Sequence, residues 1–141
     1  MKIFNLKTAA AASLFLLSAT FTSCKDDDDT NVKPEPVIPT ITITSPTPGQ
    51  EVKANQTVNI TGTIKAEHTL HGYTISIRKK DDTTHVFKKE IHDHKAEISI
   101  NQPWTVDNYK SHTDLELEIV SALDHDGKTI SKKVSFHAIN L

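Results

Sequence analysis

The chain has 141 residues, with 16 lysines and arginines against 18 aspartates and glutamates, and a formal net charge of −2. No long basic stretch is present, which argues against a nucleic-acid partner, and the single cysteine excludes a disulfide within the chain. Eight histidines are unusual beside one cysteine and four glycines, and they raise metal binding as a hypothesis because imidazole is the commonest metal ligand.

Residues 1–23 are typical of a signal peptide. Lys2 and Lys7 come before an apolar run from Ala9 to Phe21 that is too short to cross a bilayer comfortably. Thr22-Ser23-Cys24 follows and resembles the lipobox of bacterial lipoproteins. This resemblance implies cleavage before Cys24 and lipidation of that cysteine.

Residues 24–37 are predicted to form a tether. The sequence Lys25-Asp26-Asp27, extended by two more aspartates, resembles the export signal of Bacteroidetes-type surface lipoproteins. This resemblance implies a lipid-anchored protein of the outer membrane that is exposed at the cell surface. Like charges keep such a segment extended, and Pro34 and Pro36 stiffen it, so the folded part is expected to begin near Ile38.

Residues 38–141 are predicted to form one all-β domain. Apolar and polar residues alternate with the two-residue period of half-buried strands, and turn-forming residues separate the runs. The expected strands are 40–45, 57–65, 73–79, 84–91, 95–101, 113–122 and 129–138. Seven short strands favour an immunoglobulin-like antiparallel β-sandwich, with a small barrel as the alternative. The segment from Ile41 to Gly62 also resembles the start of many bacterial Ig-like domains.

Two aromatic residues lie in the longest expected connection, between Asn101 and Thr113. Trp104 and Tyr109 are predicted to cap one end of the core. Stacking on a sugar ring is the alternative role for such side chains.

Five histidines are expected to converge at one pole of this sandwich. The connections 66–72, 92–94 and 123–128 share that pole because the strand direction alternates. They carry the candidate metal ligands His68, His71, His92, His94 and His125. Carboxylates in the same connections are candidate supporting groups: Glu67, Asp93, Asp124 and Asp126. Three or four imidazoles suit zinc, copper(II) or nickel, and a carboxylate can orient the second ring nitrogen of a ligand.

The strength of the signal differs between these connections. His92 and His94 are two residues apart, so in an extended segment both point the same way and can bind one ion. The sequence from Asp124 to Gly127 is by default a tight turn. The remaining histidines, His85, His112 and His137, fall at the opposite pole and are expected to be solvated. The sequence leaves open whether they form a second site.

The sequence thus predicts a monomeric, lipid-anchored protein that captures zinc, copper or nickel outside the cytoplasm. No enzyme is predicted, because no metalloprotease, hydrolase or nucleotide-binding motif is present. Metal affinity is expected to fall as the pH drops through roughly 6.5, since only neutral imidazole binds a metal. The alternative is a structural or accessory module that binds a protein or glycan partner and has no metal site.

Overall fold

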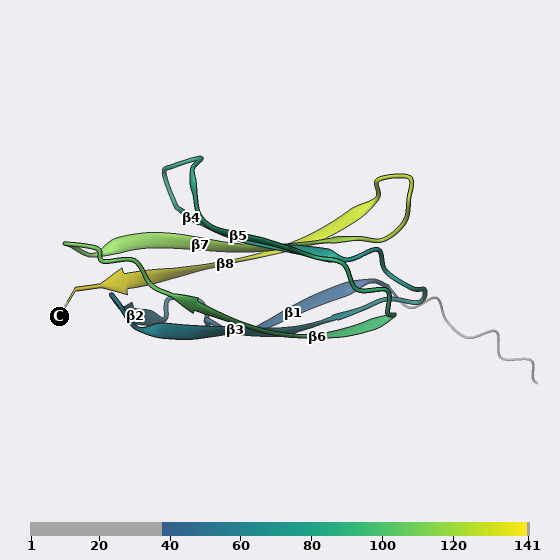
Figure 1. Ribbon diagram of the computed structural model, residues 1–141, viewed down its shortest axis with the longest axis horizontal. Helices are drawn as coiled ribbons and strands as arrows, with labels where there is room; N and C mark the ends of the chain where they lie inside the picture. Colours follow the sequence, from purple (N-terminus) through teal and green to yellow (C-terminus); the bar gives the residue numbers. More distant parts are fainter. Residues whose placement is uncertain (1–37, 141) are drawn as a thin grey trace, which may run out of the picture. The chain divides into compact units, whose positions relative to one another are not determined.

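The structure is a computed structural model that describes residues 38–140, which form a two-layered β-sandwich (Figure 1). Its strands are β1 (Thr40–Ser45), β2 (Glu51–Lys53), β3 (Thr57–Lys65), β4 (Tyr73–Lys79), β5 (His85–Ile91), β6 (Glu97–Thr105), β7 (Thr113–Ala122) and β8 (Thr129–Ile139). The predicted all-β sandwich is confirmed. The predicted signal peptide, Cys24 and the tether to residue 37 lie outside the described residues.

Two sheets make up the sandwich. The three-stranded sheet has the order β1-β3-β6, and the five-stranded sheet has the order β2-β8-β7-β4-β5. Neighbouring strands are antiparallel except for β2, which pairs in parallel with the end of β8. Within residues 38–140, no helix is long and apolar enough to cross a membrane.

The seven expected strands are all present with shifts at some of their ends, and β2 is an additional eighth strand. β2 was not predicted, because three residues are too few to show a period. β6 continues to Thr105, so Trp104 lies in a strand and its predicted place in a connection is wrong. The long backbone register between β3 and β6, from Lys65–Glu97 to Thr57–Thr105, accounts for this extension.

The position of β5 separates this sandwich from an immunoglobulin constant domain. In that domain the fourth strand belongs to the sheet of the first and second strands, whereas here β5 hydrogen-bonds to β4 at the edge of the five-stranded sheet. The short turn at 80–84 makes a local hairpin with β4, which explains the pairing. Strand directions do not change, so the connections stay at the predicted poles.

Alternating apolar residues of both sheets fill the core. Leu115, Leu117 and Ile119 of β7 are fully buried, as the two-residue period predicts. Trp104 of β6 packs edge-on against Phe136 of β8, with ring centroids 6.2 Å apart, and so joins the two sheets. Trp104 is only 5% exposed, which excludes the alternative that it stacks on a sugar ring.

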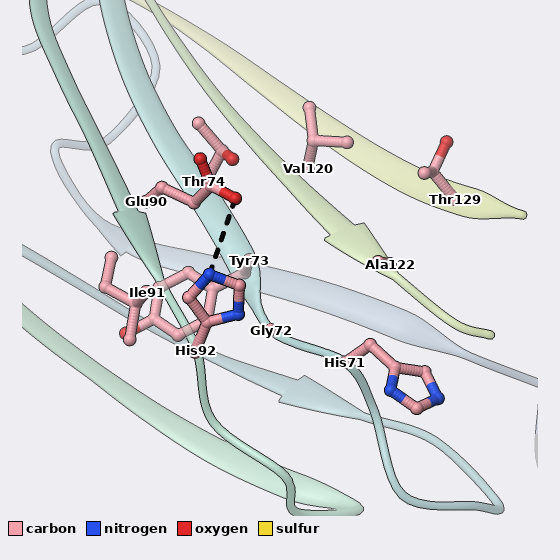
Figure 2. A pocket seen from close by; sticks show the side chains of 10 residues that line it. All are labelled: His71, Gly72, Tyr73, Thr74, Glu90, Ile91, His92, Val120, Ala122 and Thr129. Atoms are coloured by element: carbon pink, nitrogen blue, oxygen red, sulfur yellow. Dashed lines mark ion pairs between the residues drawn. The ribbon is translucent and has the colours of Figure 1, made fainter. Parts of the chain in front are cut away.

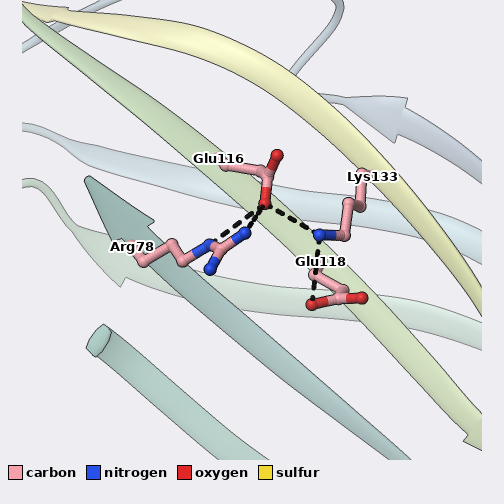
Figure 3. Close-up of polar contacts among 4 residues, drawn as sticks. All are labelled: Arg78, Glu116, Glu118 and Lys133. Atoms are coloured by element: carbon pink, nitrogen blue, oxygen red, sulfur yellow. Dashed lines mark hydrogen bonds and ion pairs between the residues drawn. The ribbon is translucent and has the colours of Figure 1, made fainter. Parts of the chain in front are cut away.

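The outer face of the five-stranded sheet carries an ionic network across three strands (Figure 3). Glu116 of β7 accepts hydrogen bonds from Arg78 of β4, at 2.6 and 3.0 Å, and from Lys133 of β8, at 3.1 Å. Lys133 also lies 3.8 Å from Glu118. The hydrogen bonds from Arg78, followed by those from Lys133, lower the pKa of Glu116 below its usual range.

Candidate metal centres

The connections 66–72, 92–96 and 123–128 meet at one end of the sandwich. The backbone N–H of His71 donates to the carbonyl of Ala122, at the end of β7, over 3.1 Å. The backbone N–H of Leu70 donates to the carbonyl of Lys95 over 3.2 Å. Because the Leu70 side chain is fully buried, it anchors the first connection against the other two.

A glycine next to His71 allows the chain to turn into β4. Gly72 has a φ of 109°, and a β-carbon at this position would collide with the backbone carbonyl of Ile91. Its own carbonyl accepts hydrogen bonds from the backbone N–H of Ala122 and the hydroxyl of Ser121, both at 3.1 Å. The sharp turn therefore places the His71 ring beside the connection at 123–128.

Three of the five predicted histidines lie together at this end. The ring centroids of His71 and His125 are 3.7 Å apart, and those of His71 and His94 are 5.5 Å apart in an edge-on arrangement. The Nδ1 atom of His71 is buried and has no hydrogen-bond partner. Each of the three rings comes from a different connection. We call these three residues the loop histidine cluster: His71, His94 and His125.

The other two predicted ligands lie elsewhere. His92 shares a hollow of about 150 Å³ with His71, but its ring lies apart from the His71 ring, with Nε2 3.7 Å from Glu90 (Figure 2). His68 lines a separate hollow of about 250 Å³ with Pro39 and Leu123. His92 and His94 lie between β5 and β6, outside both strands. Their binding of one shared ion stays a prediction.

The predicted supporting carboxylates have other roles. Asp124 accepts backbone hydrogen bonds from Asp126 at 2.9 Å and Lys128 at 3.0 Å, and that of Lys128 has the larger effect in lowering its pKa. Asp93 pairs with Lys95 at 3.2 Å. Glu67 lines the hollow of His68, and Asp126 is exposed on the turn. Asp124 thus stabilises a tight turn, as its sequence context indicates by default.

The opposite end carries a tighter cluster, and the sequence does not predict its central residue, Asp114. One oxygen of Asp114, Oδ1, lies 2.7 Å from Nδ1 of His137 and 3.2 Å from Nε2 of His112. One potential ligand atom from each of these residues lies within 4.8 Å of the others, and no other group of three within residues 38–140 meets this criterion. We call it the strand-end cluster: His112, Asp114 and His137.

The register of β7 and β8 explains this cluster. Asp114 and His137 are direct cross-strand partners on the outer face of the sheet, and His112 comes two residues before Asp114. His112 and His137, whose grouping the sequence leaves open, therefore lie together. The alternation within each strand predicts that Asp114 and His137 face outward. Their position opposite each other follows only from the register between β7 and β8. His85, the third histidine of this pole, is exposed and lies outside the cluster.

The strand-end cluster is partly exposed and anionic in its centre. The hydrogen bond from His137, followed by that from His112, lowers the pKa of Asp114 below its usual range. Asp114 and His112 also line an open hollow of about 440 Å³ with Asp81 and Asp82 and with two lysines. A cation can therefore reach the carboxylate from solvent.

The chain is similar to a described protein family and to several solved structures. Residues 22–131 match the family described as a domain of unknown function (DUF4625). A solved structure of the fibronectin(III)-like modules of Clostridium thermocellum CbhA is 20% identical, with a TM-score of 0.41, over 72% of this chain and 94% of that chain. No curated protein matches the chain.

Proposed function

The chain belongs to the family of the domain of unknown function DUF4625, and we propose that it is a lipid-anchored binding protein that captures a transition-metal ion outside the cytoplasm. The observation that carries the proposal is the strand-end cluster, with three potential ligand atoms within 4.8 Å. Zinc is the favoured ion, because two imidazoles and one carboxylate are common zinc ligands and leave a fourth position for water. No reaction is part of the proposal.

The spacing of the cluster supports zinc. Ligand atoms of a tetrahedral zinc ion lie about 3.3 Å apart when each is near 2.0 Å from the metal. The separations from Asp114 to His112 and His137 are 3.2 and 2.7 Å, which are shorter than this by about 0.1 and 0.6 Å. Imidazoles that share such an ion have ring centroids about 5 Å apart, and those of His112 and His137 are 4.8 Å apart.

The backbone around the cluster supports a preformed site. His137 lies within β8, between β2 and β7, and its backbone N–H donates to the carbonyl of Gln50 over 2.9 Å. The carbonyl of Asp114 accepts a hydrogen bond from the backbone N–H of Lys80 over 3.0 Å. Ligands on paired strands lose little freedom when they bind an ion, which favours affinity.

Calorimetric titration of the purified full-length protein with zinc tests the proposal. We expect His137→Ala to lower the stoichiometry by one equivalent, or to weaken that equivalent at least tenfold, because one of three ligands is lost. His112→Ala provides a second variant. His112 is exposed and lies outside the strands, so this substitution is expected to leave the fold intact.

The matched control is His85→Ala, which removes an exposed histidine at the same pole but outside the cluster. Equal zinc binding by His85→Ala, His137→Ala and the unchanged protein would contradict the proposal. The domain would then be better explained as a structural or accessory module for a protein or glycan partner.

A further inference from the structure

The loop histidine cluster lies at the other end of the domain, and it has no carboxylate at its centre. Within residues 38–140, no hydrogen bond or ion pair engages the ring atoms of His71, His94 or His125. A buried imidazole nitrogen without a partner destabilises the folded protein, and the Nδ1 atom of His71 is in this state. Bound metal is one partner that such a nitrogen can take.

We propose that the loop histidine cluster is a second transition-metal site, made of three imidazoles, that is independent of the strand-end cluster. His71 is its fixed member, because hydrogen bonds to Ala122 and the buried Leu70 beside it hold its backbone. His94 and His125 are exposed members of the two neighbouring connections. Three nitrogen ligands suit copper(II), nickel and zinc.

The three rings do not bring one ligand atom each within 4.8 Å of the others, so binding of one ion requires the exposed rings to move. The His71–His94 centroid distance of 5.5 Å is close to the separation of about 5 Å expected for two imidazoles on one tetrahedral ion. The His71–His125 distance of 3.7 Å is shorter, so the His125 ring must move outward by about 1 Å to share the ion. His125 is free to do so because it lies exposed in a turn.

The two clusters are too far apart to share an ion. The loop cluster lies next to the last residue of β7, and the strand-end cluster lies at its first residues. A ten-residue strand is about 30 Å long. The inference therefore adds a second site rather than further ligands for the first one.

Zinc titration followed by NMR of the histidine ring nitrogens tests the inference in the full-length His137→Ala protein, in which the strand-end cluster is disabled. We expect one equivalent of zinc to change the chemical shifts of the ring nitrogens of His71, His94 and His125 together. We also expect His125→Ala to weaken this binding at least tenfold, because it removes one of three ligands. Calorimetry of the same variants measures the affinity.

His68→Ala is the matched control, because His68 lies in the same connection as His71 but lines a different hollow. It is expected to leave the affinity unchanged within about twofold. No zinc binding in the His137→Ala background, or equal losses from His68→Ala and His125→Ala, would overturn the inference. Neither result would affect the strand-end proposal, whose test is the loss caused by His137→Ala itself.

Discussion

At the scale of single residues, Gly72 controls the placement of the loop histidines. Its φ of 109° and its contact with the Ile91 carbonyl leave no room for a side chain. We expect Gly72→Ala to lower the free energy of unfolding by about 3 kcal/mol, since it combines a strained backbone with a collision. Chemical denaturation measures this loss.

Gly127→Ala is the control for the backbone contribution alone. Gly127 also has a positive φ, 85°, but a β-carbon there would meet nothing within 4 Å. We expect a loss of about 1 kcal/mol from the strained conformation. Equal losses at the two positions would show that the contact with Ile91 is not important.

Single residues also show where sequence reasoning about the site stopped. The convergence of His71, His94 and His125 depends on the order of the strands along the chain. The two-residue periods predict the strands, and the antiparallel sandwich makes their direction alternate. The exclusion of His68 and His92 depends on which way each side chain leaves its loop, and loop conformation has no period. Asp114 was missed because its two histidine partners are recognisable only once β7 and β8 are aligned.

At the scale of elements, the network on β4, β7 and β8 links three strands through Glu116. We expect Glu116→Gln to lower the free energy of unfolding at pH 7 by about 1 kcal/mol, since it removes the charge shared by Arg78 and Lys133. Glu118→Gln is the control and is expected to cost less, because Glu118 lies 3.8 Å from Lys133.

The effect of Glu116 should depend on pH in one direction. Its pKa is lower in the folded protein, so its stabilisation is present above the unfolded pKa of about 4.3 and is lost as the pH falls through the folded value. The difference between the unchanged protein and Glu116→Gln should therefore begin to shrink as the pH falls below about 4.3 and should continue to shrink as the pH falls further. Urea unfolding between pH 7 and pH 3 measures this, and a constant difference would contradict the assignment.

The elements themselves were largely predictable from the sequence. Long strands such as 113–122 have a regular period because one face packs on the core. The three-residue strand β2 and the sheet membership of β5 were not predictable. β2 depends on backbone pairing with β8, which is distant in sequence, and the sheet membership of β5 depends on pairing with β4. Backbone pairing has little effect on the pattern of apolar and polar side chains.

At the scale of the whole molecule, the proposed lipid anchor would decide where the two proposed metal sites act. We expect Cys24→Ala to release the protein from the membrane fraction, because the acyl chains attach at that residue. Replacing Asp26 and Asp27 with alanine is the control. It should leave the protein in the membrane fraction but protect it from external protease. Cell fractionation with protease treatment measures both, and membrane retention of Cys24→Ala would contradict the anchor.

The course of the chain into the sandwich has a consequence for an anchored protein. Pro39 lies beside His68 and Leu123, so the polypeptide enters at the end that carries the loop histidines, and β1 then runs away from it. An anchor upstream would therefore be joined to the end of the domain that carries the loop histidines, and the strand-end cluster would lie at the far end. The two proposed sites would then lie about 30 Å apart along the domain, one near the point where the tether attaches and one remote from it.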